Sequence, residues 1–232
     1  MRLGIMQPYL FPYIGYFQLI NSVDKFIIFD DINYINKGWV NRNRILLNNQ
    51  DYLFTIPLEK ASQNRLINEI YLTDNNRWKE KILKTLNSAY KKAPMFSEIY
   101  PMLEKLIYFE ERHLSHYIYN SIEQICNYLR INTSLVKSSL VYGTTQMKGQ
   151  NKILEICRTE NTDVYINPYG GLDLYQKKSF KKLGIELFFL KSKAICYKQF
   201  TDKFISDLSI IDVMMFNDKD NISGYLNEYE LI

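Results

Sequence analysis

Cysteine and glycine are scarce in this sequence. Its 232 residues include three cysteines and nine glycines. Cys126, Cys157 and Cys196 form neither a CxxC pair nor any other spacing typical of zinc ligands. Their odd number is typical of a reducing compartment rather than of a disulfide-bonded secreted domain. We therefore predict a cytoplasmic protein in which each thiol packs as a small apolar side chain.

Long apolar runs are also missing. No stretch approaches the roughly 20 apolar residues that a membrane-spanning helix needs. The first residues, Arg2 to Met6, form a strand-like run that Gln7-Pro8 breaks, which fits neither a secretory nor a transit peptide. We expect no transmembrane segment and a chain that begins directly with its fold.

Neither sign of charge dominates. The chain has 29 basic and 25 acidic residues, a net charge of +4, and they are spread along its whole length. This balance does not favour a nucleic-acid partner. It is compatible with an anionic small molecule, such as a nucleotide sugar, if a few Arg and Lys side chains converge.

The common signatures of nucleotide, nucleophile and metal chemistry are absent. The sequence contains no GxGxxG, GxxxxGK[ST] or GxSxG motif, so Rossmann dinucleotide, P-loop and α/β-hydrolase sites are unsupported. His113 and His116 form an HxxH pair without the intervening Glu or a third ligand. We therefore predict no metal site and no bound cofactor.

What the sequence has in abundance is aromatic residues. They make up 15% of the chain, with 19 Tyr, beside 47% apolar and 23% charged residues. The overall balance is typical of a packed fold, and the length favours one domain over residues 1–232. Tyrosine combines an apolar ring with a polar tip, which suits the wall of a sugar or nucleotide pocket. An AT-rich genome would produce the same bias without any function.

The order of apolar runs predicts an α/β fold with an open, mainly parallel sheet and flanking helices. Strands are expected at 2–6 and 25–29, joined by a Pro-rich loop over 7–15 and a short helix, which is the opening of a βαβ unit. Residues 76–130 are expected to form a helical insertion. Further strands are expected at 52–56, 67–73, 134–137, 164–166 and 185–190. Further helices are expected at 151–159, after the turn at 168–171 up to about 183, and at 206–216. Residues 217–232 are polar and predicted to be weakly structured.

The first candidate site is the loop after the first strand. Gln7 can both donate and accept hydrogen bonds, and the turn would offer backbone N–H groups at a helix start, which favour anions. Tyr9, Tyr13 and Tyr16 are the expected substrate-binding residues of this loop. The alternative is a purely structural loop anchored by its prolines and aromatic rings.

The second candidate site follows the second strand. Asp30 and Asp31 stand where open α/β sheets place their ligands, and either could accept a proton. Arg42 and Arg44 would point to one face of a strand and could clamp a diphosphate. The other substrate-binding residues expected here are Lys37, Trp39, Asn41 and Asn43. A solvated turn with surface salt bridges is the alternative.

The third candidate site follows the predicted strand at 164–166. Gly170 and Gly171 would let the backbone approach a ligand closely, and Tyr169 and Tyr175 would flank it. A plain turn would explain the same residues.

Several of these segments together closely resemble the WbqC-like family of bacterial polysaccharide gene clusters. The resemblance is carried by Met6 to Phe17, Phe29 to Tyr34 and Trp39 to Ile45, and extends through Trp78, Tyr90 to Pro94, Tyr165 to Tyr175 and Leu208 to Asp212. It covers nearly the whole chain. One departure is Gly170-Gly171, where the family more often has a Ser-Gly pair, so a hydroxyl at that point is not available for catalysis.

The resemblance implies a part in making O-antigen, lipopolysaccharide, capsule or flagellin sugars. The activity it implies is transfer of an acyl or aminoacyl group, such as glycyl, to the amine of a nucleotide-linked amino sugar. The co-substrate would be a carrier-protein thioester, a coenzyme A thioester or an aminoacyl adenylate, and an acyl carrier protein is one expected partner. The alternatives are a nucleotidyl- or glycosyltransferase and a non-catalytic nucleotide-sugar-binding protein of the same pathway.

These sites lead to three geometric and chemical expectations. Tyr9, Asp30 and Tyr169 should line one pocket, because parallel connections bring strand ends to one edge of the sheet. Arg42 and Arg44 should bind the diphosphate. Asp30 or Asp31, assisted by Gln7, should carry the catalytic proton transfer rather than a cysteine or a histidine.

Overall fold

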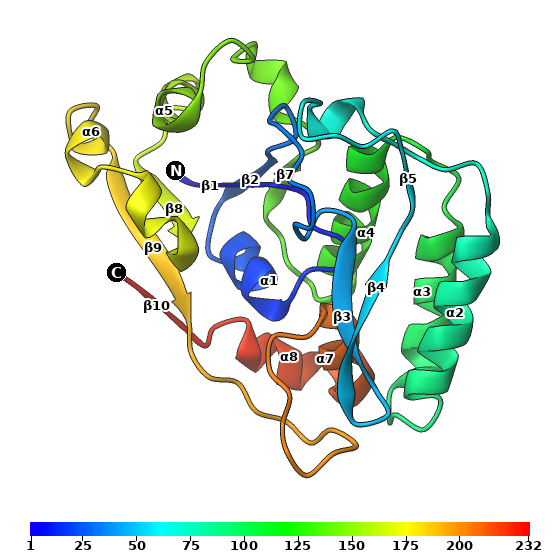
Figure 1. The fold of residues 1–232 in the computed structure, drawn as a ribbon. Helices are drawn as coiled ribbons and strands as arrows, with labels where there is room; N and C mark the ends of the chain where they lie inside the picture. Colours follow the sequence, from blue (N-terminus) through cyan, green and yellow to red (C-terminus); the bar gives the residue numbers. More distant parts are fainter.

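A six-stranded sheet forms the centre of the protein. A computed structural model describes residues 1–232, and its sheet has the strand order β10-β9-β8-β1-β2-β7 (Figure 1). Five strands of this sheet, β1, β2, β7, β8 and β9, are parallel, and β10 pairs antiparallel with β9 at one edge. The strands are β1 (Arg2–Met6), β2 (Lys25–Ile28), β7 (Ser134–Val136), β8 (Val164–Pro168), β9 (Glu186–Ser192) and β10 (Tyr229–Leu231). The predicted α/β fold with a mainly parallel sheet is confirmed.

The strand order reverses direction at the centre of the sheet. From β1 the chain moves outward through β2 to β7, then returns to the other side of β1 and moves outward through β8 and β9. This is the 3-2-1-4-5 order of doubly wound folds. Connections leave β1 and β8 in opposite directions, so a crevice opens outside the carboxyl ends of these two strands.

Helices cover both faces of the sheet. Leu3, Ile5 and Tyr165 point to the face that carries α5 (Gly149–Thr159) and α6 (Lys177–Lys181), where they form a small core. Other residues of the inner strands, such as Phe26 on β2 and Ile166 on β8, belong to a core of 47 residues on the opposite face. This two-residue alternation explains why the strands read as nearly continuous apolar runs.

The larger core packs the remaining helices. They are α1 (Ile14–Asn21), α2 (Arg77–Tyr90), α3 (Phe96–Tyr108), α4 (Leu114–Tyr128), α7 (Ile210–Phe216) and α8 (Lys219–Tyr225). The segment predicted to be a helical insertion, 76–130, contains α2 to α4. Pro101 lies inside α3, which continues through it. No helix is both long and apolar enough to cross a membrane.

Two small antiparallel hairpins lie beside the sheet. The first pairs β3 (Arg42–Leu47) with β4 (Gln50–Thr55), and its turn residues Asn48 and Asn49 both have positive φ, as a tight two-residue hairpin requires. The second pairs β5 (Leu58–Glu59) with β6 (Tyr71–Leu72). The strand predicted over 67–73 is therefore wrong for most of its length, because 67–69 form a 3₁₀ turn.

The end of the chain is more regular than its polarity predicts. Residues 217–232, expected to be weakly structured, contain α8 and β10. Ile222 and Leu226, four residues apart, give α8 a buried face, and the Asp218 side chain caps its start by accepting from the backbone N–H of Asn221. Two apolar residues at the right spacing were enough to dock this segment.

A buried carboxylate ties the C-terminal part of the larger core together. Asp212 accepts hydrogen bonds from the Tyr90 and Tyr197 hydroxyls, both at 2.7 Å, and from the Gln199 side chain at 2.8 Å. Burial outweighs these donors and raises the pKa of Asp212 above its ordinary value. The network fixes the loop after β9 against α2 and α7.

This raised pKa predicts a pH dependence of stability. Folding favours the protonated form of Asp212, so its contribution is fully present below the pKa of the unfolded chain, about 3.9, and is lost as pH rises through the folded pKa. The free energy of unfolding of wild type should therefore fall over that window relative to Asp212→Asn. Urea titrations of both proteins from pH 4 to pH 8 measure this difference. Parallel pH curves for the two proteins would contradict the assignment.

Candidate functional site

A cleft of about 690 Å³ opens at the carboxyl ends of β1, β2 and β8. It therefore lies at the reversal of the strand order, where doubly wound folds bind their ligands. Its polar lining residues are Gln7, Tyr9, Asp31, Asn33, Thr145, Lys148, Gln150, Lys152, Asn167 and Tyr175, and Gly149, Gly170 and Gly171 contribute backbone. The expectation that these strand ends converge on one pocket holds.

The expected trio of Tyr9, Asp30 and Tyr169 is correct only for Tyr9. Asp31 and Gly170 line the cleft in place of their neighbours Asp30 and Tyr169. These residues lie just beyond the strands: β2 ends at Ile28, and Tyr169 and Gly170 belong to a 3₁₀ turn, Tyr169–Leu174. The sequence predicted the edge of the sheet but not which residues of these turns face the cleft.

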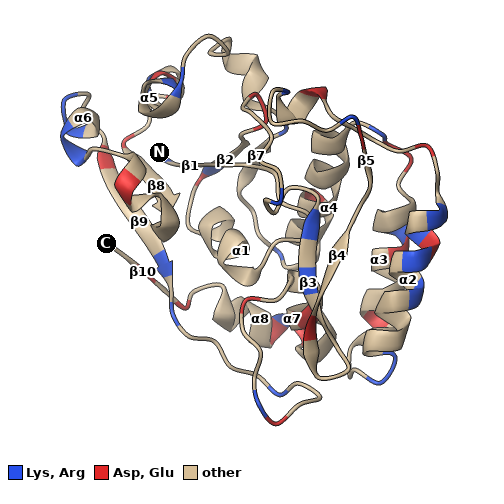
Figure 2. Ribbon diagram, viewed as in Figure 1, with Lys and Arg blue, Asp and Glu red and all other residues tan.

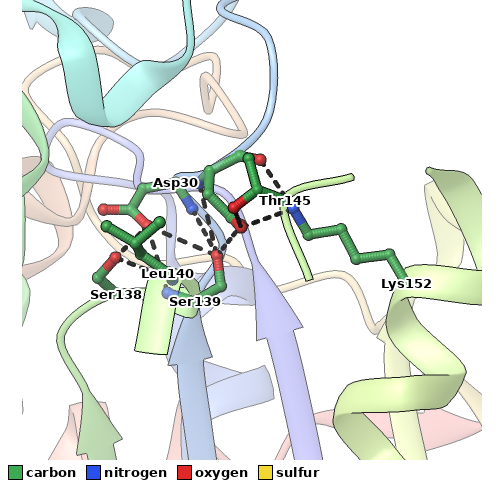
Figure 3. A network of polar contacts seen from close by, with 7 residues as sticks. Asp30, Ser138, Ser139, Leu140, Thr145 and Lys152 are labelled. Atoms are coloured by element: carbon green, nitrogen blue, oxygen red, sulfur yellow. Dashed lines mark hydrogen bonds and ion pairs between the residues drawn. The ribbon is translucent and has the colours of Figure 1, made fainter. Parts of the chain in front are cut away.

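Asp30 is a buried structural carboxylate. Its side chain accepts a hydrogen bond from the Ser115 hydroxyl at 2.6 Å. It also accepts from the Ser138 hydroxyl at 2.6 Å and from the backbone N–H of Ser139 at 3.2 Å, two residues that lie beside it in Figure 3. It has no exposed surface. These bonds join the end of β2 to α4 and to the loop after β7, which places Asp30 behind the cleft rather than in it.

Asp31 forms a buried ion pair with Lys152. The Lys152 ammonium lies 2.7 Å from the Asp31 carboxylate and donates at 2.8 Å to the Asp31 carbonyl oxygen. Both side chains are at most 1% exposed. The Ser139 hydroxyl also donates to the Asp31 carboxylate. Lys152 belongs to the first turn of α5 and points toward Thr145 and Ser139 in Figure 3. The charge of each group is thus held in place beneath the cleft floor.

Thr145 connects this ion pair with the cleft, and Gln7 is a second polar group of the cleft lining. The Thr145 hydroxyl lies 3.4 Å from the Asp31 carboxylate, and Thr145 itself is exposed and lines the cleft. Gln7 also lines the cleft, and its side-chain amide makes no hydrogen bond with the rest of the protein, while its carbonyl oxygen accepts from the Tyr16 hydroxyl. Thr145 and Gln7 are therefore two polar groups that can meet a ligand directly.

The start of α5 faces the same cleft. Lys148, Gly149 and Gln150 line it, and Gly143 and Gly149 take positive φ on either side of the loop. The first N–H groups of a helix and an adjacent ammonium favour anions. Neither this loop nor Lys152 is among the predicted site residues. The sequence does carry a signal here, because a predicted strand is followed by a loop from Gly143 to Gly149 and then by a predicted helix.

The Pro-rich loop contributes Gln7 and Tyr9 to the cleft, while the rest of it is structural. Tyr16 is buried, and Tyr13 lies in two smaller hollows next to Asp207. Burial, together with the nearby Tyr13 phenol, raises the pKa of Tyr9 to about 12, so its hydroxyl stays protonated near neutral pH. Tyr9 can thus donate a hydrogen bond to a ligand but does not act as a base.

The two asparagines of the second candidate segment hold loops in place. The buried Asn43 amide donates to the carbonyl oxygens of Leu10 and Phe11 at 3.0 and 2.8 Å, which fixes the Pro-rich loop. The buried Asn41 accepts from the Tyr34 hydroxyl and donates to the carbonyl of Ile56. Neither lines the cleft, so direct contact with a ligand there is excluded in this conformation.

Arg42, Arg44, Trp39 and Lys37 also lie outside the cleft. The two guanidinium groups flank the half-exposed Trp39 ring at 5.8 and 5.6 Å, as expected for alternate residues of one strand. Arg42 donates to the carbonyl oxygens of Lys37 and Gly38, and Arg44 pairs with Asp51 at 3.2 Å. A shallow hollow of about 270 Å³ contains Trp39 and Arg44, and Tyr9 is the residue it shares with the cleft.

The turn after β8 forms the remaining wall. A Cβ at Gly171 would lie 1.9 Å from the Asn167 side-chain amide nitrogen, so a larger residue here would have to displace the Asn167 side chain. A Cβ at Gly170 would meet nothing, so this backbone is open to the cleft. Tyr175 lines the cleft and packs edge-on against Tyr165. The predicted close approach of backbone to ligand is thus sterically possible at Gly170.

Cysteine and histidine side chains are absent from the cleft. Burial raises the pKa of Cys126 and of Cys157 to about 12, and Cys196 is exposed in a separate hollow. The side chain of His113 caps the start of α4, and His116 lies 3.4 Å from Glu111. No group of three or more His, Cys, Asp or Glu side chains is placed to hold a metal ion.

Comparison with known proteins identifies the family. The model of the WbqC-like protein family matches residues 7–223. The protein named "Uncharacterized protein Rv1507c" of Mycobacterium tuberculosis (strain ATCC 25618 / H37Rv) is 30% identical over 223 residues, which cover 93% of each chain. No solved structure matches. The chain belongs to the WbqC-like protein family, which is associated with surface-polysaccharide gene clusters.

Proposed function

We propose that this protein transfers an acyl or aminoacyl group to the amine of a nucleotide-linked amino sugar, with the reaction taking place in the cleft beside β1 and β8. The observation that carries the proposal is the placement of that cleft at the reversal of strand order, the usual nucleotide site of doubly wound folds. Its volume, about 690 Å³, is within the range of small-molecule sites.

One end of the cleft suits the diphosphate of the sugar nucleotide. Lys148 supplies an ammonium without an acidic partner, and the start of α5 supplies backbone N–H groups at Gly149 and Gln150. Tyr9 and Tyr175 supply aromatic faces and hydroxyls for the sugar or the base. In this proposal Lys148 and the start of α5 bind the diphosphate, a role that the sequence predicts for Arg42 and Arg44.

The transfer itself needs a proton acceptor more than a covalent nucleophile. The amine nitrogen forms the new N–C bond while the C–S bond of a thioester donor, or the C–O bond of an adenylate, breaks. The amine proton passes through the Thr145 hydroxyl to Asp31 and then to the departing group. Thr145 and Asp31 are 3.4 Å apart, which is long, and we expect the loop to tighten on substrate binding. The Gln7 amide can donate to the developing oxyanion.

Incubation with a dTDP- or UDP-linked 4-amino sugar and a panel of acyl donors tests the proposal. The expected product is the N-acylated nucleotide sugar, detected by mass spectrometry. Release of diphosphate or of the free nucleotide would instead identify a nucleotidyl- or glycosyltransferase, which the same strand order would serve. Binding without turnover would identify a non-catalytic protein of the pathway.

The proposed diphosphate end predicts a defined loss of affinity. Lys148→Ala should weaken binding of the nucleotide sugar about tenfold, the scale of one hydrogen bond to a charged group. Isothermal titration calorimetry measures the dissociation constant. Lys84→Ala, which removes an exposed lysine of α2 remote from the cleft, is the control and should bind as wild type does. Equal affinities for wild type and Lys148→Ala would remove this lysine from the site.

A further inference from the structure

The wall of the cleft formed after β8 continues into a strongly basic segment. Residues 169–184 contain four lysines and one acidic residue, Asp173, a local net charge of +3. The lysines, Lys177, Lys178, Lys181 and Lys182, belong to α6 and its end, are all exposed, and take part in no ion pair. Figure 2 shows α6 as a basic element at one side of the molecule, apart from the mixed charges of α2 and α3.

Apolar side chains are exposed next to these lysines. Leu174 is 69% exposed and lines the cleft, while Tyr169, Leu172 and Leu183 are between 41% and 49% exposed. Exposed apolar residues rimmed by polar groups are one mark of a protein–protein contact, whose rim is polar and solvent-accessible. We call the segment 169–184, with its lysines and these apolar residues, the α6 surface.

The α6 surface and the cleft are physically continuous. Gly170, Leu174 and Tyr175 line the cleft, and the first lysine of α6 follows Tyr175 by two residues. A partner bound on the α6 surface would therefore stand at the cleft entrance. A flexible arm of that partner could enter the cleft beside Gly170, which lines it and has open space around its Cα.

We propose that the α6 surface docks an acidic carrier protein that delivers the acyl group as a thioester on its phosphopantetheine arm. This inference rests on the proposed function and selects among its three donors. Coenzyme A and an adenylate are small and need no docking surface outside the cleft. Acidic residues of the carrier match the four unpaired lysines, and the apolar residues of the surface cover the core of the contact.

A binding measurement tests the docking independently of catalysis. The probe is a purified, acidic bacterial acyl carrier protein that carries an acetyl thioester and a fluorescent label, and the readout is fluorescence anisotropy at low and moderate salt. Lys181→Glu/Lys182→Glu should weaken binding about tenfold, and salt should weaken the wild-type complex. Lys91→Glu/Lys92→Glu is the matched control, since it reverses two adjacent exposed lysines after the end of α2, and should bind as wild type does.

A transfer assay with two donors separates this proposal from the proposed function. In Lys181→Glu/Lys182→Glu, transfer from the carrier thioester should fall about tenfold while transfer from acetyl coenzyme A stays at the wild-type rate. Carrier binding without transfer from any donor would leave the docking intact and overturn the transferase. Absence of carrier binding, an equal loss in the control variant, or binding instead to phosphatidylglycerol vesicles would overturn the docking.

Discussion

Lys152→Met is expected to lower the free energy of unfolding by about 3–5 kcal/mol. The substitution keeps most of the side-chain volume but leaves the Asp31 carboxylate buried without its counter-ion, 2.7 Å away in wild type. The hydroxyls of Ser139 and Thr145 remain as donors but carry no charge. Urea titration at pH 7 gives the change as a shift in midpoint at constant slope.

Two further variants locate the cause of this loss. Lys193→Met removes a lysine from an exposed pair with Glu228 and should change the free energy of unfolding by less than about 1 kcal/mol. Lys152→Met combined with Asp31→Leu removes both charges and should recover much of the stability. If the double variant is no more stable than Lys152→Met alone, the packing of Lys152 rather than the ion pair explains the loss.

The sequence predicted the parts of the fold that depend on local pattern. Apolar runs at 2–6, 25–29 and 164–166 are buried from both sides and could only be inner strands, and α2 and α4 follow from apolar residues every three or four positions. The segment 67–73 was misread because its apolar residues face the core from a 3₁₀ turn, whose backbone the pattern does not reveal. β10 was missed because three residues at a sheet edge carry almost no periodic signal.

The sequence predicted the position of the candidate site at the strand ends but not all of the side chains that form it. Gln7, Tyr9, Asp31 and the Gly170-Gly171 pair do line the cleft, because the carboxyl ends of parallel strands share one edge. Lys152 could not be placed from sequence, since it sits in an amphipathic helix where a lysine is normally solvated. Its position beneath the cleft depends on how α5 packs on the sheet, 121 residues after Asp31 in the chain.

Asp31→Asn is expected to lower the turnover of acyl transfer by roughly 10²–10⁴-fold with a modest effect on nucleotide-sugar binding. In the proposed mechanism the amide cannot accept the proton that Thr145 passes on, whereas Lys148 and the start of α5, which we propose bind the diphosphate, are unchanged. The measurement is kcat and KM with the nucleotide amino sugar as the varied substrate. Asp30→Asn is the comparator, because Asp30 lies behind the cleft and should mainly affect stability.

Thr145 gives the same mechanism a test that does not disturb the buried ion pair. Thr145→Val keeps the shape of an exposed side chain but removes the hydroxyl, so kcat should fall by roughly 10²-fold or more while the unfolding curve stays that of wild type. Thr145→Ser restores a hydroxyl and should recover most of the rate. Full turnover in both Thr145→Val and Asp31→Asn, with loss of turnover in Cys196→Ala, would replace the proton relay by a covalent thioester mechanism at that exposed thiol.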